Sequence, residues 1–384
     1  MKLRHTSPHQ LLFNMGLKKK IGVLPGDGIG PEVVAEAIKV LNAVAEKHGH
    51  QFTYSYGDVG AIAIDKTGEP LPDETLAICE ASDAFLFGAI GHPKYDNDPK
   101  AKVRPEQGLL KLRKSLGLYA NIRPVTAYDS LLHMSPLKTE KIKGVDIVVY
   151  RELTGGIYFG EKGRTEDGAY DHCTYSNYEI DRIAHLAFQA AQNRRKHVTL
   201  VDKANVLETS RLWRERVTEI AKEYTDVKLD TMFVDNAAMQ MIQNPKQFDV
   251  ILTENMFGDI ISDEASVIGG SLGLLPSASV GDKTAMFEPI HGSYPQATGQ
   301  NIANPLATIL SAAMMLDHLG LIDEAIEVRQ AVNSSLRNGM VTSDLAKEQS
   351  YGTDRVGDFI ANCILDGEDS CAQTNIRAGI STII

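Results

Sequence analysis

Acidic side chains suited to a divalent cation occur at two places in the sequence. The stretch "ENMFGDIISDEAS" carries Asp259 and Asp263 four residues apart on a predicted helix, so both carboxylates lie on one face. The stretch "FVDNAAM" carries Asp235 at the predicted end of a strand, the edge where open α/β sheets keep their sites. Such oxygen ligands suit Mg²⁺ or Mn²⁺. Each motif also has a simpler explanation when it is taken alone. Asp259 and Asp263 can stabilise the helix dipole, and Asp235 can cap the helix that follows it.

Two further residues can exchange protons. Lys203 in "VDKANVL" follows another predicted strand, and a lysine held near cations can lose its proton near neutral pH and act as a base. Tyr158 follows the Gly-Gly turn of "YRELTGGIYFGEKGR", where a tyrosine among cations can donate a proton. Judged by spacing alone, Lys203 is more simply interpreted as an ordinary surface lysine and Tyr158 as an aromatic residue of a strand.

Arginines and leucines alternate in "RPEQGLLKLRKSLGLYANIRP". Arg113 lies four residues after Leu109 and three after Leu110, so the three share a helix face. Arg123 follows, and Arg151 ends a predicted strand. Clustered arginines bind carboxylates in a bidentate manner, and the leucines beside them suggest a substrate with acid groups and a branched aliphatic arm. An amphipathic surface helix is an equally good interpretation.

The glycine-rich stretch "KKKIGVLPGDGIGPEVV" is similar to a dinucleotide loop but departs from its pattern. The third glycine of G-x-G-x-x-G would be Pro31 when counted from Gly26, and Val33 when counted from Gly28. The pattern alone leaves open whether the loop borders a ligand. A second polar segment, "FEPIHGSYPQATGQNIANP", is a candidate binding loop because ordered loops of this length are usually functional.

The elements that must position these residues alternate along the chain. Apolar strand-like runs alternate with helical patterns, which predicts an α/β fold with a substantially parallel sheet. Helices are expected at residues 31–47, 178–193 and 304–319, the second capped by Asn177. The predicted strands cover residues 21–24, 52–56, 84–88, 147–151, 198–202, 232–235 and 250–253.

Composition narrows the function classes. The 384 residues are 43% hydrophobic and 23% charged, which is typical of a globular chain with two domains or one large one. A net charge of −11 disfavours a nucleic-acid or anionic-membrane partner. No apolar run approaches the roughly 18 residues of a membrane span, and the four cysteines match no disulfide framework or zinc site. We therefore expect a cytoplasmic protein, with uninformative ends at residues 1–18 and 366–384.

Taken together, the motifs occur in the order found in the 3-isopropylmalate dehydrogenases, and the chain resembles that group from about Lys19 to Leu365. Isocitrate and homoisocitrate enzymes of the wider β-decarboxylating dehydrogenase family are similar at the aspartates and the lysine. They usually differ at "RELTGG" and at the Glu-x-x-Leu-Leu-x-x-Arg helix. The motifs that carry the resemblance are "PGDGIGPEV", "RELTGGIYFG", "DKANVL", "DNAAMQ", "NMFGDIISDEAS", "LGLLPSAS", "HGSYPQATG" and "NIANP", together with the helix from Glu106 to Arg113 and Arg123.

The resemblance implies a fold and a reaction. The fold would be the two-domain isopropylmalate dehydrogenase type, with a mixed, largely parallel sheet that is not the usual Rossmann fold. Residues 19–118 and 271–365 would form the cofactor-side domain, and residues 119–270 a central domain with the dimer interface and metal site. The reaction would be NAD-dependent oxidative decarboxylation of 3-isopropylmalate to 4-methyl-2-oxopentanoate and CO₂ in leucine biosynthesis.

Roles for the charged residues also follow from the resemblance. A Mg²⁺ or Mn²⁺ ion is expected on Asp259, Asp263 and, from the second subunit of a homodimer, Asp235, which also touches the substrate. Lys203 of that second subunit would take the hydroxyl proton, and Tyr158 would help to protonate the product carbon. A sister enzyme acting on isocitrate, homoisocitrate or tartrate would keep these groups but change the leucine face. A non-catalytic regulatory subunit would lose at least one of them, and none is lost.

Substrate and cofactor contacts complete the expectation. NAD would lie mainly on the loop after Gly88 and on the loop after His291, with the glycine-rich loop bordering the cleft at most. Gln296 stands where most members carry an Asp thought to bind the adenosine ribose. The expected substrate contacts are Arg113, Arg123 and Arg151 for the carboxylates, Leu109, Leu110 and Val206 for the isopropyl arm, and Glu106 between that arm and the nicotinamide. The expected cofactor contacts are Gly88, Ala89, Ile90, Gly91, His291, Gly292, Ser293, Tyr294, Pro295, Gln296, Ala297 and Asn304.

Overall fold

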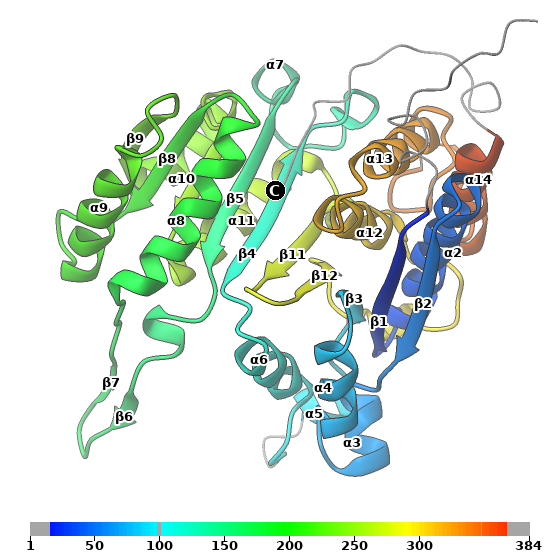
Figure 1. Ribbon diagram of the computed structural model, residues 1–384, viewed down its shortest axis with the longest axis horizontal. Coiled ribbons are helices and arrows are strands. Elements are labelled where there is room, and N and C mark those ends of the chain that lie inside the picture. Colours follow the sequence, from blue (N-terminus) through cyan, green and yellow to red (C-terminus); the bar gives the residue numbers. More distant parts are fainter. Residues whose placement is uncertain (1–15, 98–100, 347, 367–384) are drawn as a thin grey trace, which may run out of the picture.

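One mixed sheet of ten strands runs through the molecule, in the order β2-β1-β3-β12-β11-β4-β5-β10-β8-β9 (Figure 1). The computed structural model describes residues 16–97, 101–346 and 348–366, so the expectations for residues 1–18 and 366–384 fall almost entirely outside the described residues. The strands of this sheet are β1 (Lys18–Gly26), β2 (Gln51–Tyr56), β3 (Ala84–Ala89), β4 (Ala120–Thr126), β5 (Asp146–Glu152), β8 (His197–Asp202), β9 (Lys228–Phe233), β10 (Val250–Thr253), β11 (Pro276–Val280) and β12 (Ala285–Pro289).

The direction of the strands confirms the α/β fold with a mixed, largely parallel sheet. Strand β11 pairs antiparallel with β12 and with β4, and β4 pairs antiparallel with β5. The remaining neighbouring pairs of the sheet are parallel. Parallel strands have their carboxyl ends at one edge, which is where ligand sites of open α/β sheets occur.

Helices cover both faces of the sheet, as the almost wholly buried strands β3, β8 and β10 require. Helix α12 packs on β12, β11 and β3, α8 packs on β5, β8 and β10, and α11 packs on β4 and β5. The helices are α2 (Gly30–His48), α3 (Ala61–Thr67), α4 (Asp73–Glu80), α5 (Pro93–Asp96), α6 (Pro105–Ser115), α7 (Thr139–Ile142), α8 (Asn177–Gln192), α9 (Glu208–Ala221), α10 (Val234–Gln243), α11 (Asn255–Gly269), α12 (Leu306–His318), α13 (Ile322–Arg337) and α14 (Thr353–Asp366).

Three details differ from the sequence-based expectation. Strand β9 ends at Phe233, so Asp235 lies in the first turn of α10 and not in the strand. The N-cap of α8 is Ser176, whose hydroxyl accepts from the Glu179 amide in a capping box, and not Asn177. Strands β4, β11 and β12 are not among the predicted strands, and β4 carries Pro124 in its interior, where proline argues against a central strand. Strand β11 pairs only with residues 120–122 of β4, so Pro124 faces no β11 residue.

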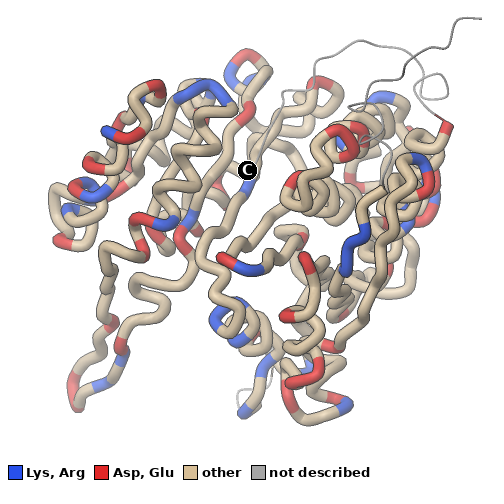
Figure 2. The backbone as a smooth tube through the Cα atoms, viewed as in Figure 1, with Lys and Arg blue, Asp and Glu red and all other residues tan. Residues whose placement is uncertain are grey.

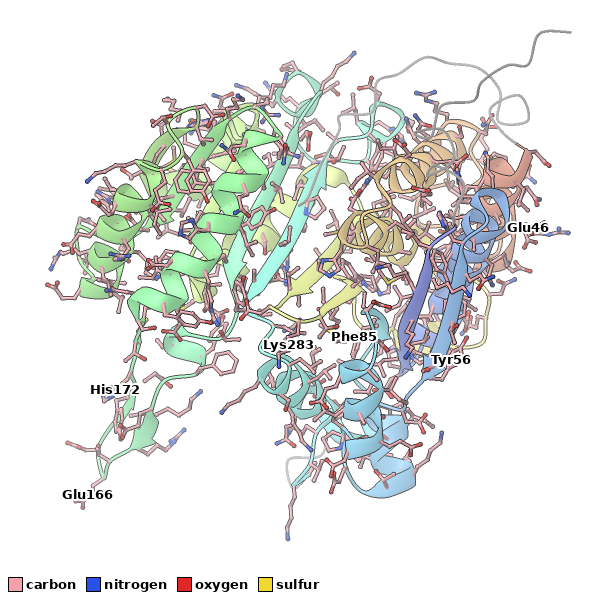
Figure 3. All side chains as sticks on the ribbon, viewed as in Figure 1. Glu46, Tyr56, Phe85, Glu166, His172 and Lys283 are labelled. Carbon is pink, nitrogen blue, oxygen red and sulfur yellow. The ribbon has the colours of Figure 1, made fainter. Side chains whose placement is uncertain are left out.

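A small hairpin of β6 (Lys162–Arg164) and β7 (Ala169–Asp171) projects from the body of the molecule (Figure 1). Figure 3 labels Glu166 at its tip and His172 at its base. Acidic and basic residues are interspersed along the backbone (Figure 2). None of the helices in the described part of the chain combines the length and the apolar composition that crossing a bilayer requires.

Candidate active site

Arg151 lies at the centre of a charged cluster. It is the penultimate residue of β5 and only 6% exposed. Helix α11 passes so close that a Cβ added at Gly258 would lie 2.6 Å from the Arg151 Cγ. Burial, followed by the nearby charges of Arg123 and Arg113, lowers the pKa of Arg151 to about 10. Arg113 and Arg123 from one predicted motif and Arg151 from another therefore lie close enough for their charges to interact.

The cluster joins these arginines to the two aspartates of α11. Arg151 forms a short ion pair through Nη1 with the Oδ1 of Asp259. Arg123, on β4, donates from Nη1 to the Oδ1 of Asp263 at 2.8 Å, and Asp263 remains largely exposed. The helix therefore presents two carboxylates, one turn apart, toward a guanidinium on each of two neighbouring strands.

Tyr158 reaches the same carboxylate as Arg151. It ends a single 3₁₀ turn, η3 (Gly156–Tyr158), which follows the Gly-Gly turn predicted from the sequence. Its hydroxyl donates to the Oδ2 of Asp259 at 3.0 Å, and the Arg151 guanidinium lies 6.0 Å from its ring. Partial burial and the bond to Asp259 raise the pKa of the Tyr158 hydroxyl. The phenol is therefore a protonated donor at neutral pH, placed among charged groups.

Helix α6 supplies an exposed apolar side chain to this region. Leu110 is 49% exposed, whereas Leu109 packs partly into a core cluster that includes Leu112. Arg113 is half-buried and donates to the Oε1 of Glu288 on β12 at 2.7 Å. Glu106 is exposed in the first turn of the helix. The two leucines predicted as a pair thus differ, because only Leu110 offers most of its side chain to a ligand.

Lys203 and Asp235 form a second, separate constellation. Lys203 directly follows β8, and its Nζ lies 2.5 Å from the Oδ1 of Asp235 in α10. This hydrogen bond lowers the pKa of the Asp235 carboxyl. Val206, three residues after the lysine, is 60% exposed. Among the described residues, neither Lys203 nor Asp235 forms a hydrogen bond or ion pair with Asp259 or Asp263.

The predicted metal ligands are therefore not gathered within one chain. The described residues contain no group of three His, Cys, Asp or Glu side chains able to hold a metal. Asp259 and Asp263 nevertheless provide two carboxylates on one helix face, and the Asp263 side chain is 66% exposed. Hard oxygen donors of this kind fit Mg²⁺ or Mn²⁺, provided that further oxygen ligands come from outside the single chain.

The glycine-rich loop at residues 26–30 holds the two expected cofactor segments together. The amide of Asp27 donates to the Ala89 carbonyl, and the amide of Ile29 to the Ser293 carbonyl, each at 2.8 Å. The buried Asp27 carboxylate accepts from the amide of Gly91 at 3.0 Å and from two amides of α3. Gly28 has φ +59°, and a Cβ there would overlap the Ser293 carbonyl oxygen. The glycines therefore serve close backbone packing.

The two segments themselves differ in exposure. Ala89 and Ser293 are buried against the glycine-rich loop, whereas Gln296 is exposed in the short turn η6 (Pro295–Ala297). Burial lowers the pKa of His291, and its buried Nε2 has no hydrogen-bond partner among the described residues. Asn304 is fixed at both ends of its amide, donating to Asp344 at 3.0 Å and accepting from the Leu306 amide at 3.0 Å.

The remaining cofactor candidates have mixed surroundings. Gly91 is buried, Ile90 packs partly against a core cluster, and Gly292 is exposed. Tyr294 is exposed and has a left-handed backbone, with φ +38°. An orphaned imidazole nitrogen beside exposed backbone is an arrangement that fits a bound polar cofactor.

Sequence reasoning missed residues that support the cluster from behind. Asn255 accepts from two nitrogens of Arg151, and Asn121 accepts from the Nε of Arg123 at 2.8 Å. Ser262 accepts from the Nη1 of Arg123 at 2.9 Å. Glu288 likewise accepts from Arg113. Asp27, which sequence reasoning also missed, holds the amides of Gly91 and α3 and not the cluster. A short polar residue at the start of a helix or in a strand usually serves as a cap or an ordinary surface group. Their spacing in the sequence does not distinguish these residues from ordinary caps or surface residues.

Comparisons with known proteins show which proteins this chain resembles. The model of the isocitrate/isopropylmalate dehydrogenase family matches residues 20–360. The 3-isopropylmalate dehydrogenase of Bacteroides fragilis is 56% identical over 347 residues, which cover 90% of this chain and 98% of that protein. The corresponding protein of Wolinella succinogenes is 57% identical over 350 residues, with the same coverage of 90% and 98%.

Solved structures are also similar. An isocitrate dehydrogenase from Methylococcus capsulatus superposes with a TM-score of 0.79 at 37% identity, covering 90% of this chain and 99% of that one. A β-decarboxylating dehydrogenase from Thermococcus kodakarensis superposes with a TM-score of 0.77 at 38% identity, covering 91% of this chain and 96% of that one.

Proposed function

Because the chain belongs to the isocitrate/isopropylmalate dehydrogenase family, we propose that it oxidises and decarboxylates 3-isopropylmalate with NAD⁺. The products are 4-methyl-2-oxopentanoate and CO₂, in a step of leucine biosynthesis. The curated relatives at 56% and 57% identity are named 3-isopropylmalate dehydrogenase. The observation that carries the proposal is the charged cluster of Arg113, Arg123 and Arg151 with an exposed aliphatic side chain, Leu110, on α6.

The substrate is a dicarboxylate with a branched arm, and the cluster offers a partner for each part. The three arginines hold the two carboxylates, since guanidinium groups bind carboxylates by paired hydrogen bonds. Leu110, with Leu109 behind it and Val206 from across the site, contacts the isopropyl arm. Glu106 lies between that arm and the nicotinamide.

Asp259, Asp263 and Asp235 are the residues that would hold a Mg²⁺ or Mn²⁺ ion. When bound, the ion supplies Lewis-acid stabilisation of the negative charge that develops on substrate oxygens. Arg151 and Arg123, which pair with Asp259 and Asp263, then have donors available for the substrate carboxylates.

Two side chains of the protein move protons in this scheme. Lys203 takes the proton of the C2 hydroxyl while hydride leaves C2, so that a ketone forms at that carbon. The carboxylate on C3 then departs as CO₂ and leaves its electron pair as an enolate. Tyr158, whose hydroxyl is protonated and oriented by Asp259, supplies the proton that takes the place of the departed carboxylate on C3.

We propose that the site is completed by a second copy of the chain. Lys203 and Asp235 pair with each other and not with the cluster of the same chain, so a homodimer would bring the partner subunit's Lys203 and Asp235 to it. Helices α10 and α11 pack together. They present exposed apolar side chains suited to such an interface, namely Met239, Ile242, Ile260 and Val267.

The chain then divides into two functional parts. Residues 19–118 with 271–365 form the cofactor side, and residues 119–270 the side that carries the aspartates of α11 and the dimer contacts. NAD⁺, which accepts the hydride, is held by the segments at residues 88–91 and 291–304. Closure of the two parts would exclude water from the enolate. The expected location is the cytoplasm.

An assay of NADH formation over a panel of 2-hydroxy diacids tests the proposal. The panel contains 3-isopropylmalate, malate, tartrate, isocitrate and homoisocitrate, each with Mn²⁺. We expect 3-isopropylmalate to give the highest kcat/KM. A higher value for isocitrate, homoisocitrate or tartrate would assign the chain to a sister activity, and no turnover of any substrate would indicate a regulatory subunit.

A further inference from the structure

Asn255 occupies the junction of the three segments that carry the charged cluster. It is the first residue of α11 and only 1% exposed. Its Oδ1 accepts from Arg151, at 3.1 Å from Nε and 2.9 Å from Nη2. Its Nδ2 donates to the carbonyl of Gly155 at 3.1 Å. The buried side-chain amide of Asn255 thus contacts both β5 and the turn before Tyr158. Asp259 lies one turn after Asn255 on the same helix, α11.

The contact with Arg151 decides which edge of the guanidinium is available. An arginine can meet a carboxylate through its Nε and Nη2 edge or through its two Nη atoms. Asn255 occupies the first edge, so the Nη end points to Asp259, with which Nη1 pairs. The close approach of Gly258 to the stem of Arg151 leaves the side chain little freedom to turn.

The contact with Gly155 decides where Tyr158 stands. Gly155 and Gly156 form the turn into η3, and Gly156 has φ +74°. A Cβ added at Gly156 would overlap the hydroxyl of Tyr175. The turn is therefore fixed from two sides, by the hydrogen bond of Asn255 to the Gly155 carbonyl and by the packed ring of Tyr175. From this turn the Tyr158 hydroxyl reaches Asp259.

Asn255 is itself held in place. Its backbone amide donates to the Tyr175 hydroxyl at 3.0 Å, and that hydroxyl donates to the buried Glu254 carboxylate at 3.0 Å. Glu254 also caps α11 by accepting from the Phe257 amide at 2.8 Å. The side-chain oxygen and nitrogen of Asn255 are therefore both engaged, and almost none of the residue is exposed.

We infer that Asn255 is a positioning residue that sets Arg151, Tyr158 and Asp259 relative to one another. Its oxygen orients the group that binds a substrate carboxylate, and its nitrogen orients the group that returns a proton. Loss of the oxygen should therefore raise KM, and loss of the nitrogen should lower kcat. A merely structural residue would lower thermal stability without separating these two parameters.

Two variants separate the two contacts. Asn255→Asp keeps an acceptor for Arg151 but sets a second oxygen against the Gly155 carbonyl, so we expect kcat to fall about tenfold with KM within about threefold. Asn255→Ala removes both contacts, so we expect KM to rise about tenfold as well. Thr75→Val, which removes a partly buried hydrogen bond to the Asp58 carbonyl far along the chain from the cluster, is the control and should lower Tm alone.

A double-mutant cycle tests whether Asn255 acts through Tyr158. In a Tyr158→Phe background, Asn255→Asp should change kcat by less than about twofold, because the group that it orients is gone. An equal loss of kcat in both backgrounds, or wild-type kinetics for Asn255→Ala, would overturn the inference.

The kinetic readout rests on the proposed function, and wild-type turnover of 3-isopropylmalate tests that function by itself. A crystal structure of Asn255→Asp tests the inference independently. We expect the Gly155 carbonyl and the Tyr158 ring to be displaced from their wild-type positions while Arg151 stays in place. A Gly155–Tyr158 turn that superposes on the wild type would overturn the inference whatever the substrate is.

Discussion

Lys203 and Asp235 form an ion pair, with 2.5 Å between Nζ and Oδ1, although they belong to different strand-to-helix junctions. Adjacent parallel strands explain the pairing, because β8 and β9 run side by side and end at the same edge of the sheet. In the proposed function Lys203 is the base and Asp235 an oxygen ligand of the metal, but the arginine cluster lies on β4, β5 and α6. This separation is the reason for proposing an active site that two subunits share.

Replacing Lys203 with Met tests its role as the base. We expect kcat to fall by about 10² or more, the usual scale for a positioned base, while substrate and Mn²⁺ binding stay largely intact. Stopped-flow turnover and calorimetric binding separate the two effects. Lys222→Met, which removes an exposed lysine of a surface ion pair with Glu219, is the matched control. Near-normal turnover of Lys203→Met at neutral pH would exclude the assignment.

Asp259→Asn and Asp263→Asn should each weaken activation by Mn²⁺, because each removes a charged ligand from a hard-cation site. Asp259 also neutralises the buried Arg151, whereas Asp263 is largely exposed. We therefore expect Asp259→Asn to lower Tm more than Asp263→Asn. Activity is titrated with Mn²⁺, and the exposed Asp73→Asn of α4 is the control. If both variants saturate at the wild-type Mn²⁺ concentration, the two acids serve the helix dipole and not a metal.

The unequal exposure of Leu109 and Leu110 permits a sharper test of the aliphatic pocket. Leu110→Ala should reduce kcat/KM for 3-isopropylmalate selectively over malate, because an apolar pocket discriminates by about 1–3 kcal/mol for each methylene group of the substrate that it contacts. Leu109→Ala should in addition destabilise the fold by about 1–2 kcal/mol, less than a fully buried leucine. Urea unfolding and kinetics on a series of 3-alkylmalates distinguish them. An equal loss across that series would place the arm elsewhere.

Gln296 should set the cofactor preference. An Asp at this position would accept from a ribose 2′-hydroxyl and repel a 2′-phosphate, whereas the amide can accept a hydrogen bond but carries no repelling charge. No Lys or Arg lies between His291 and Asn304 to bind that phosphate, and Gln296 is exposed. We expect NAD⁺ to be preferred. Gln296→Asp should raise the NAD⁺/NADP⁺ ratio of kcat/KM, and Gln296→Lys should lower it. Wild-type preference for NADP⁺ would contradict this assignment.

The sequence predicts elements well where burial dictates residue type. Strand β10 reads "VILT", and its predicted and observed bounds agree, because a strand covered on both faces must be apolar throughout. Strand β4 carries Asn121 and Pro124, residues that strand propensity disfavours. Its place in the sheet is fixed by pairing with β5 and β11, and pairing partners distant in the chain leave no local pattern.

Some residues of the candidate site can be predicted from the sequence, and others cannot. Residue types and order point to the arginines, the aspartates, Lys203 and Tyr158, and the structure brings the arginines and the α11 aspartates together. The role of Asp27 is not predictable from the sequence. A carboxylate inside a glycine-rich stretch offers no sign that it will accept from the Gly91 amide, because that contact joins segments 64 residues apart.

The strand order has a consequence for biosynthesis of the polypeptide. Strands β3 and β4 are made early, but β12 and β11, which lie between them, begin only at residues 285 and 276. While the ribosome adds the roughly 150 residues between β4 and β11, both strands keep an open edge, and such edges favour intermolecular pairing. The nascent chain therefore exposes these two edges to intermolecular pairing until residues 276–289 have been made.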